Sequence, residues 1–240
     1  MPDLILNQDL KANNVFEFNI EFDKVYNLVS AILEQLNHTS LFDPTKKSIH
    51  LSELSLPMFV QIPNWNGDIA WISAASKESF EFFDLCFREL QIENKTRKIA
   101  HLDFPLMMYS GFFVARSYVT STYYHEDYTK ECGNNAFTMM TPVQIDETAE
   151  FGHLLYKNVF QKESKYRYKK GNAIIFGSDF IHSTEPFESK QKYIFLCFTY
   201  GTTDLTKWDN IKETVTEQGV SYRHPNGIIN VTNAKFKKYF

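Results

Sequence analysis

The chain has 240 residues, of which 43% are hydrophobic and 22% charged, and its formal net charge is −4. This composition is typical of a soluble globular protein, and the length is enough for one domain with its own core. Lysine and arginine form no basic stripe and no apolar run is long enough to span a bilayer, so we expect neither nucleic acid nor a membrane as a partner.

Cysteine usage and the N-terminal sequence favour a reducing compartment. Cys86, Cys132 and Cys197 are odd in number, widely spaced and without a CxxC pair, which predicts neither a disulfide framework nor a zinc knuckle. The N-terminus lacks the basic start and long apolar run of a signal peptide. We therefore expect a cytoplasmic protein.

The first part of the chain, residues 1–97, predicts helices. Apolar residues recur at helical spacing between Asp23, a plausible N-cap, and Asn37. A second apolar face with helical spacing follows Ser76 and runs to Leu90. We expect both helices to pack on the core of the protein.

The sequence changes to short β-branched and aromatic runs from residue 98 onward. Turn residues separate these runs, and the aromatic share of the whole chain is 16%, both typical of antiparallel sheet. Eight short strands predict a mainly β fold with a jelly-roll (cupin-like, double-stranded β-helix) core over 98–201 and a C-terminal extension over 202–240 with a helix over 205–217, in a single domain, 1–240. The predicted strands are 99–104, 107–119, 122–126, 136–145, 153–159, 165–169, 173–177 and 192–200.

A candidate metal site begins with His125-Glu126-Asp127. In an extended strand, residues two apart point to the same face, so the imidazole of His125 and the carboxylate of Asp127 can reach one ion. A third ligand, His182, follows a buried apolar run that begins at a glycine turn, Gly171. Two histidines and one carboxylate leave coordination positions open on iron(II), whereas zinc usually prefers a closed tetrahedral set.

A basic residue lies ten residues beyond His182. Alternation places Lys192 on the same face as Ile194 and Leu196, inside an apolar strand. A buried ammonium must either extend to water or meet an anion, so Lys192 is a candidate for binding an anionic ligand. The alternative is a lysine at the frayed start of the strand that points into water, and Lys190 is the competing basic residue.

The region from about 107 to 201 resembles the iron(II)/2-oxoglutarate-dependent oxygenases. Its matching features are the His125-x-Asp127 pair, the Phe151-Gly-His-Leu segment, the Gly171-Asn-Ala-Ile-Ile-Phe segment before His182, and Lys192. Most members carry arginine at the position of Lys192, and a lysine there is similar to the collagen-type prolyl hydroxylases. The ammonium acts as a point charge, without the bidentate clamp of a guanidinium.

The resemblance implies three bound species, iron(II), 2-oxoglutarate and dioxygen, with the metal on His125, Asp127 and His182. It assigns the far carboxylate of 2-oxoglutarate to Lys192. Thr138 and Thr141, on the strand after the His-x-Asp pair, are further candidates to donate to a co-substrate carboxylate.

The reaction implied by the resemblance is hydroxylation of an unactivated C–H bond with release of succinate and carbon dioxide. Halogenating relatives replace the carboxylate with a small residue, and Asp127 is present here. We expect a small-molecule substrate such as an amino acid or a natural-product intermediate. The alternatives are a peptidyl or protein hydroxylase, a zinc or manganese enzyme on the same barrel, and a non-catalytic cupin-like binding module; the sequence does not predict an oligomeric state.

Five further residues near these motifs have weaker functional interpretations. His101 and His153 are typical of hydrogen-bonded structural histidines. Arg116 is a candidate for a substrate carboxylate or for a surface ion pair. Tyr123 shares the strand parity of His125, whereas Glu126 should point away from the metal.

Overall fold

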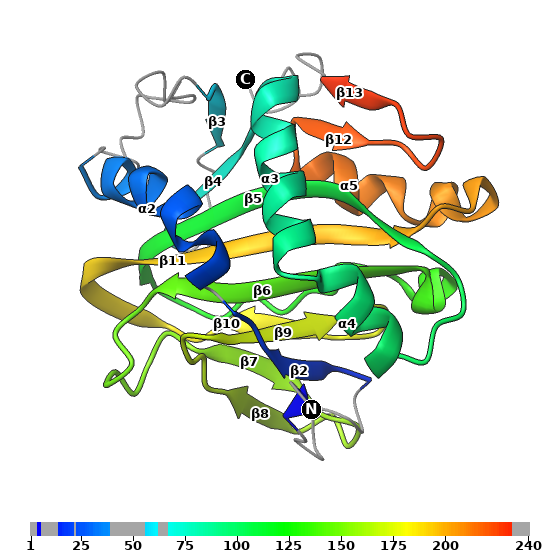
Figure 1. Ribbon diagram of the computed structural model, residues 1–240. Helices are drawn as coiled ribbons and strands as arrows, with labels where there is room; N and C mark the ends of the chain where they lie inside the picture. The colour runs from blue at the N-terminus through cyan, green and yellow to red at the C-terminus, as the bar shows by residue number, and fades with distance from the viewer. Residues whose placement is uncertain (1–3, 6–13, 22, 39–55, 62–66, 232–240) are drawn as a thin grey trace.

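The computed structural model describes residues 4–5, 14–21, 23–38, 56–61 and 67–231, and most of its strands lie in two antiparallel sheets (Figure 1). The eight strands of the large sheet are, in spatial order, Leu4–Ile5 (β1), Phe16–Asn19 (β2), Asn172–Phe176 (β9), Ala136–Gln144 (β6), Phe187–Thr202 (β11), Leu106–Val119 (β5), Gly67–Ala74 (β4) and Met58–Gln61 (β3). The small sheet consists of His182–Thr184 (β10), Leu154–Lys157 (β7) and Glu163–Tyr166 (β8). A separate pair, Ser221–Arg223 (β12) and Ile229–Val231 (β13), follows in the C-terminal extension.

Helices flank the sheets, as the sequence predicts. The two expected N-terminal helices are Asp23–His38 (α2) and Lys77–Glu89 (α3), and α3 begins at Ser76, whose hydroxyl accepts from the backbone N–H of Ser79 in a capping box. The single helix expected over 205–217 is divided into a 3₁₀ helix, Leu205–Asn210, and Lys212–Gln218 (α5). Within the described residues, no helix combines the length and the apolar character that crossing a membrane requires.

The strands that carry the most apolar residues agree with the prediction. The sequence predicts β5, β6, β7, β9 and the inner part of β11 with ends displaced by a few residues. The strand expected over 99–104 is wrong, because Ile92–Ile99 forms a helix (α4) and a turn follows it. The strand expected over 122–126 is reduced to an isolated bridge at His125.

The large sheet is buried on both faces. In Figure 1, α3 crosses one face of the sheet, and the side chains of α2 and α3 pack there against alternate residues of β5 and β11 such as Phe113 and Leu196. The intervening residues, such as Phe112 and Phe195, face the small sheet and pack with Leu154 of β7. We call the face of the large sheet that packs against α2 and α3 the helix face, and the face that packs against the small sheet the inner face. Because side chains alternate along a strand, each strand residue belongs to one of these two faces.

The N-terminal part of the chain contributes strands as well as helices. Strand β2 pairs with β9 at one side of the large sheet, and β4 pairs with β5 at the other. The predicted boundary of the core, 98–201, therefore leaves out strands that extend its main sheet. The sequence analysis assigned only helices to this part of the chain, so both β2, with four residues, and β4, with eight, were missed.

Lys192 lies on the helix face of β11. Its Nζ donates to the backbone oxygens of Leu36 at 2.7 Å and Asn37 at 3.2 Å, in the last turn of α2. The side-chain amides of Asn37 and Gln144 make two further hydrogen bonds to each other at the same place. The ammonium therefore satisfies carbonyls at a helix C-terminus, where a cation is favoured, and holds α2 against the sheet.

We expect Lys192→Met to lower the free energy of unfolding by about 1 kcal/mol, because it leaves the last carbonyls of α2 without this charged donor. Urea unfolding checks this, with Lys190→Met as the control, since Lys190 is exposed on the same strand. If Lys192→Met leaves the free energy of unfolding unchanged but weakens binding of 2-oxoglutarate, Lys192 binds the co-substrate as the sequence predicts and does not stabilise α2.

Candidate metal centre

Two histidines face each other across a backbone bridge. His125 and His182 form an antiparallel pair in which each backbone N–H donates to the other's oxygen, at 3.0 and 2.9 Å. Residues opposite each other in such a pair point to the same side. Their ring centroids are consequently 4.4 Å apart, although 57 residues separate them in the chain (182 − 125).

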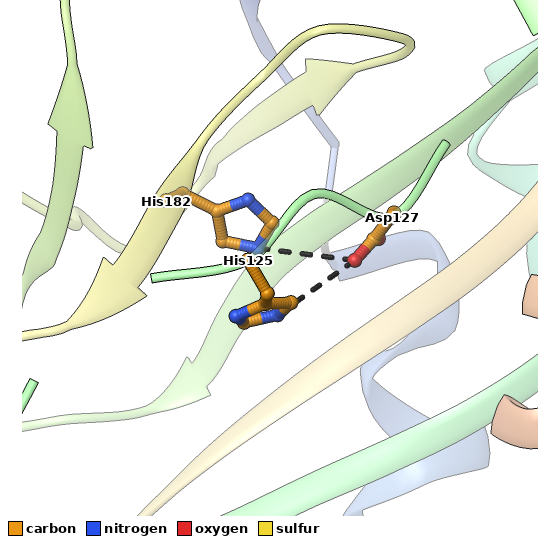
Figure 2. Close-up of side chains that lie close together, drawn as sticks. All are labelled: His125, Asp127 and His182. Carbon is orange, nitrogen blue, oxygen red and sulfur yellow. Dashed lines mark ion pairs between the residues drawn. The ribbon is translucent and has the colours of Figure 1, made fainter. Parts of the chain in front are cut away.

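Asp127 completes the group from two residues beyond His125. Its Oδ1 lies 3.8 Å from Nε2 of His125 and 3.9 Å from Nε2 of His182, as Figure 2 shows. One ligand atom of each residue falls within 4.8 Å of the others. The structure thus brings together the three residues that the sequence predicts as metal ligands.

Backbone carbonyls orient both imidazole rings. Nδ1 of His125 lies 3.1 Å from the oxygen of Tyr123, and Nδ1 of His182 lies 3.0 Å from the oxygen of Phe180. Because a carbonyl only accepts, Nδ1 carries the proton in each ring and Nε2 presents a lone pair toward Asp127. This is the arrangement that metal-binding histidines commonly show.

Burial keeps His182 in the neutral form that binds metal. The ring stacks on Phe180 and packs against Phe176, and this desolvation lowers the pKa of His182 despite the opposing effect of the Asp127 carboxylate. His125 is more open, with 35% of its side chain exposed against 7% for His182. Tyr123 stacks on the open ring and is 61% exposed.

The side chain and the backbone of Asp127 are held from two directions. Thr138 of β6 donates to Oδ2 at 2.5 Å, which leaves Oδ1 directed at the two histidines. Thr214 of α5 donates to the backbone oxygen of Asp127. Thr214 is 87 positions from Asp127 in the sequence, so the C-terminal extension also supports the site.

The two threonines predicted to contact a co-substrate have different positions. Thr138 lies on the inner face and is committed to Asp127. Thr141 shares the parity of Met139 on the helix face, and its hydroxyl donates to the backbone oxygen of Asn172 at 2.9 Å. The expectation that Thr141 faces the co-substrate is corrected, because Thr141 is three positions from Thr138 on the strand and an odd offset places its side chain on the opposite face.

The structure does not bring Lys192 to the metal ligands. Its partners lie in α2, on the opposite face of the sheet from His182, and Lys190 is exposed. A basic residue on the inner face is instead Arg116, which is 3% exposed and donates to Thr184 of β10. The sequence identified Arg116 as a candidate anion site, but the surface ion pair given as its alternative is wrong for so buried a side chain.

His153 has a structural role in this fold. It is 4% exposed, its Nδ1 accepts from the N–H of Tyr168 at 3.3 Å, and its Nε2 donates to the oxygen of Ala149 at 3.2 Å. Burial lowers its pKa, in agreement with a neutral ring. The structural interpretation from the sequence is the one that this geometry supports.

Two imidazoles and one carboxylate on one side of a point can hold a metal ion and leave positions open for other ligands, a set suited to iron(II). The two facing antiparallel sheets around this site form a double-stranded β-helix fold.

Solved structures with this fold are similar to the chain at low sequence identity. The non-haem α-ketoglutarate-dependent epimerase SnoN from nogalamycin biosynthesis matches with a TM-score of 0.57 over 81% of each chain at 9% identity. The carbocyclase SnoK from the same biosynthesis gives 0.57 over 83% of this chain and 85% of that chain at 13%. HygX from Streptomyces hygroscopicus, with nickel, 2-oxoglutarate and hygromycin B bound, gives 0.51 over 85% and 90% at 12%. No protein-family model and no curated protein matches the sequence.

We expect Thr138→Val to weaken metal binding by about 10- to 100-fold, because loss of a hydrogen bond to a metal-binding carboxylate frees its orientation. A calorimetric titration of the metal-free protein with manganese(II) measures the dissociation constant of the metal and checks this prediction. Thr141→Val is a matched control on the same strand, and equal weakening by both substitutions would contradict the orienting role of Thr138.

Proposed function

We propose that this protein is an iron(II)- and 2-oxoglutarate-dependent oxygenase that hydroxylates an unactivated C–H bond of a small molecule. The observation that carries the proposal is the convergence of His125, Asp127 and His182, whose ligand atoms lie within 4.8 Å of one another. Hydrogen bonds already fix the orientation of both imidazole rings and of the Asp127 carboxylate.

The chemistry of the bound group is that of the cofactor. When held by His125, Asp127 and His182, iron(II) would supply, together with 2-oxoglutarate and dioxygen, oxidative decarboxylation to succinate and carbon dioxide and oxidation of a substrate C–H bond. The chain contributes the three ligands, keeps His182 neutral by burial, and surrounds the site with aromatic side chains such as Phe176 and Phe180 that exclude water.

The position of Tyr123 favours a substrate that approaches over His125. That side of the site is the exposed one, whereas His182 and Asp127 are buried. An exposed aromatic ring stacked on a ligand offers an apolar surface for a substrate ring or chain. Structures similar in fold have been solved with nogalamycin RO and with hygromycin B, which supports a small natural-product intermediate over a protein side chain.

The type of oxidation is a narrower proposal. Asp127 fills the position that halogenating relatives leave open, so hydroxylation or a related oxidation is favoured. Similar structures include an epimerase and a carbocyclase, so the fold is also found with other reaction types. Hydroxylation is our first choice because it requires no functional group beyond the three metal ligands described above.

A binding module without oxygen chemistry is the second candidate. Anaerobic addition of iron(II) and 2-oxoglutarate should produce the visible metal-to-ligand charge-transfer absorption of a chelated keto acid. His182→Ala should abolish both this absorption and succinate formation, because it removes one of three ligands. His101→Ala, on an exposed histidine, is the control. Absence of the absorption in the wild-type protein would favour the binding module.

The substrate is best approached by a direct screen. Succinate release is measured with amino acids, natural-product scaffolds and peptides as trial substrates. It should rise above the level measured without substrate when an amino acid or a natural-product scaffold is added. A rise confined to peptides would assign the protein to the peptidyl hydroxylases instead. Metal-dependent turnover that needs no 2-oxoglutarate would indicate a zinc or manganese enzyme.

A further inference from the structure

Arg116 is a buried cation whose hydrogen bonds are incomplete. Its side chain is 3% exposed, and within the described part of the chain it is the only buried lysine or arginine. Nη1 donates to the Thr184 hydroxyl, but Nε and Nη2 have no hydrogen-bond partner among the residues that the structure describes. Burying an unpaired guanidinium is costly, so these two nitrogens are expected to bind an anion.

Aromatic groups on the inner face surround the guanidinium. It lies over the ring of Phe195 at 4.7 Å, and the Tyr168 hydroxyl, which neighbours the guanidinium, is also buried. Burial raises the pKa of Tyr168 to about 12, although the nearby Arg116 charge opposes the rise. Tyr168 therefore keeps its proton and can donate to the same anion as Arg116.

The strand register places this anion site beside the metal ligands. Thr184, which accepts from Arg116, is two residues from His182 on β10, so both side chains point to the same face. Two residues along a strand span about 7 Å. The four C–C bonds between the two carboxylates of 2-oxoglutarate span about 5 Å when extended. A keto acid bound at the metal therefore has the length to reach Arg116.

We propose that Arg116, assisted by Tyr168, binds the distal carboxylate of 2-oxoglutarate and so selects a dicarboxylate co-substrate. This inference rests on the proposed function, and it moves the role assigned to Lys192 onto a neighbouring strand. Arg116 of β5 lies directly opposite Tyr193 of β11, the residue after Lys192, and it reaches the inner face that Lys192 does not. A planar guanidinium with two free nitrogens suits a carboxylate better than an ammonium does.

The test compares two keto acids on the manganese(II)-loaded protein by calorimetry. 2-Oxoglutarate and 2-oxopentanoate have the same chain length, but only the first has a distal carboxylate. The wild-type protein should bind 2-oxoglutarate about 10- to 100-fold more tightly, the range expected for a charge-assisted hydrogen bond to a buried group. Arg116→Gln should remove this preference and leave the affinity for 2-oxopentanoate unchanged.

Further variants separate recognition from folding. Arg116→Lys should retain part of the preference, and Tyr168→Phe should reduce it less than Arg116→Gln does. Lys192→Met should keep the full preference. Because the readout is a ratio measured on one protein, a general loss of folding lowers both affinities and does not imitate the result.

Two outcomes overturn the proposal in different ways. If the wild-type protein prefers 2-oxoglutarate and Arg116→Gln keeps that preference, the assignment of Arg116 is wrong while the proposed function stands. If the wild-type protein binds neither keto acid, the proposed function fails and this inference fails with it.

Discussion

The pairing of β5 with β11 is the constraint on which the fold and the site depend. These two long strands lie in the middle of a sheet that is covered by helices on one face and by the small sheet on the other. A shift of one residue in their register would move Phe195 to the helices and Leu196 to the interior, exchanging both faces at once. The same register places Arg116, opposite Tyr193, on the inner face.

Local pattern was enough to predict the long strands, two helices and the three residues of the metal centre. Helix α3 is predictable because its signals are local: Ser76 is its N-cap, and the apolar residues with helical spacing follow directly in the sequence. The His125-x-Asp127 pair is likewise local, since two residues of extended chain share a face. His182 was found because a glycine turn and an apolar strand precede it.

The remaining features depend on contacts between distant parts of the chain. Strand β2 is held by β9, about 150 residues away, and nothing in its four residues predicts that partner. Alternation correctly groups Lys192 with Ile194, but β11 is apolar on both sides and parity alone does not say which side faces the metal. The sequence identifies Arg116 as a candidate for a substrate carboxylate, but its burial and its unpartnered nitrogens are visible only in the folded structure.

The unequal exposure of the two histidines gives the metal centre one solvent side and one protein side. His182 and Asp127 are enclosed, so an arriving or departing ion has to pass the edge of His125, next to the exposed ring of Tyr123. A substrate resting on Tyr123 occupies that same route. Under the proposed function, bound substrate would slow the exchange of a bound ion with chelators in solution, so that the metal is retained longer in the presence of substrate than in its absence.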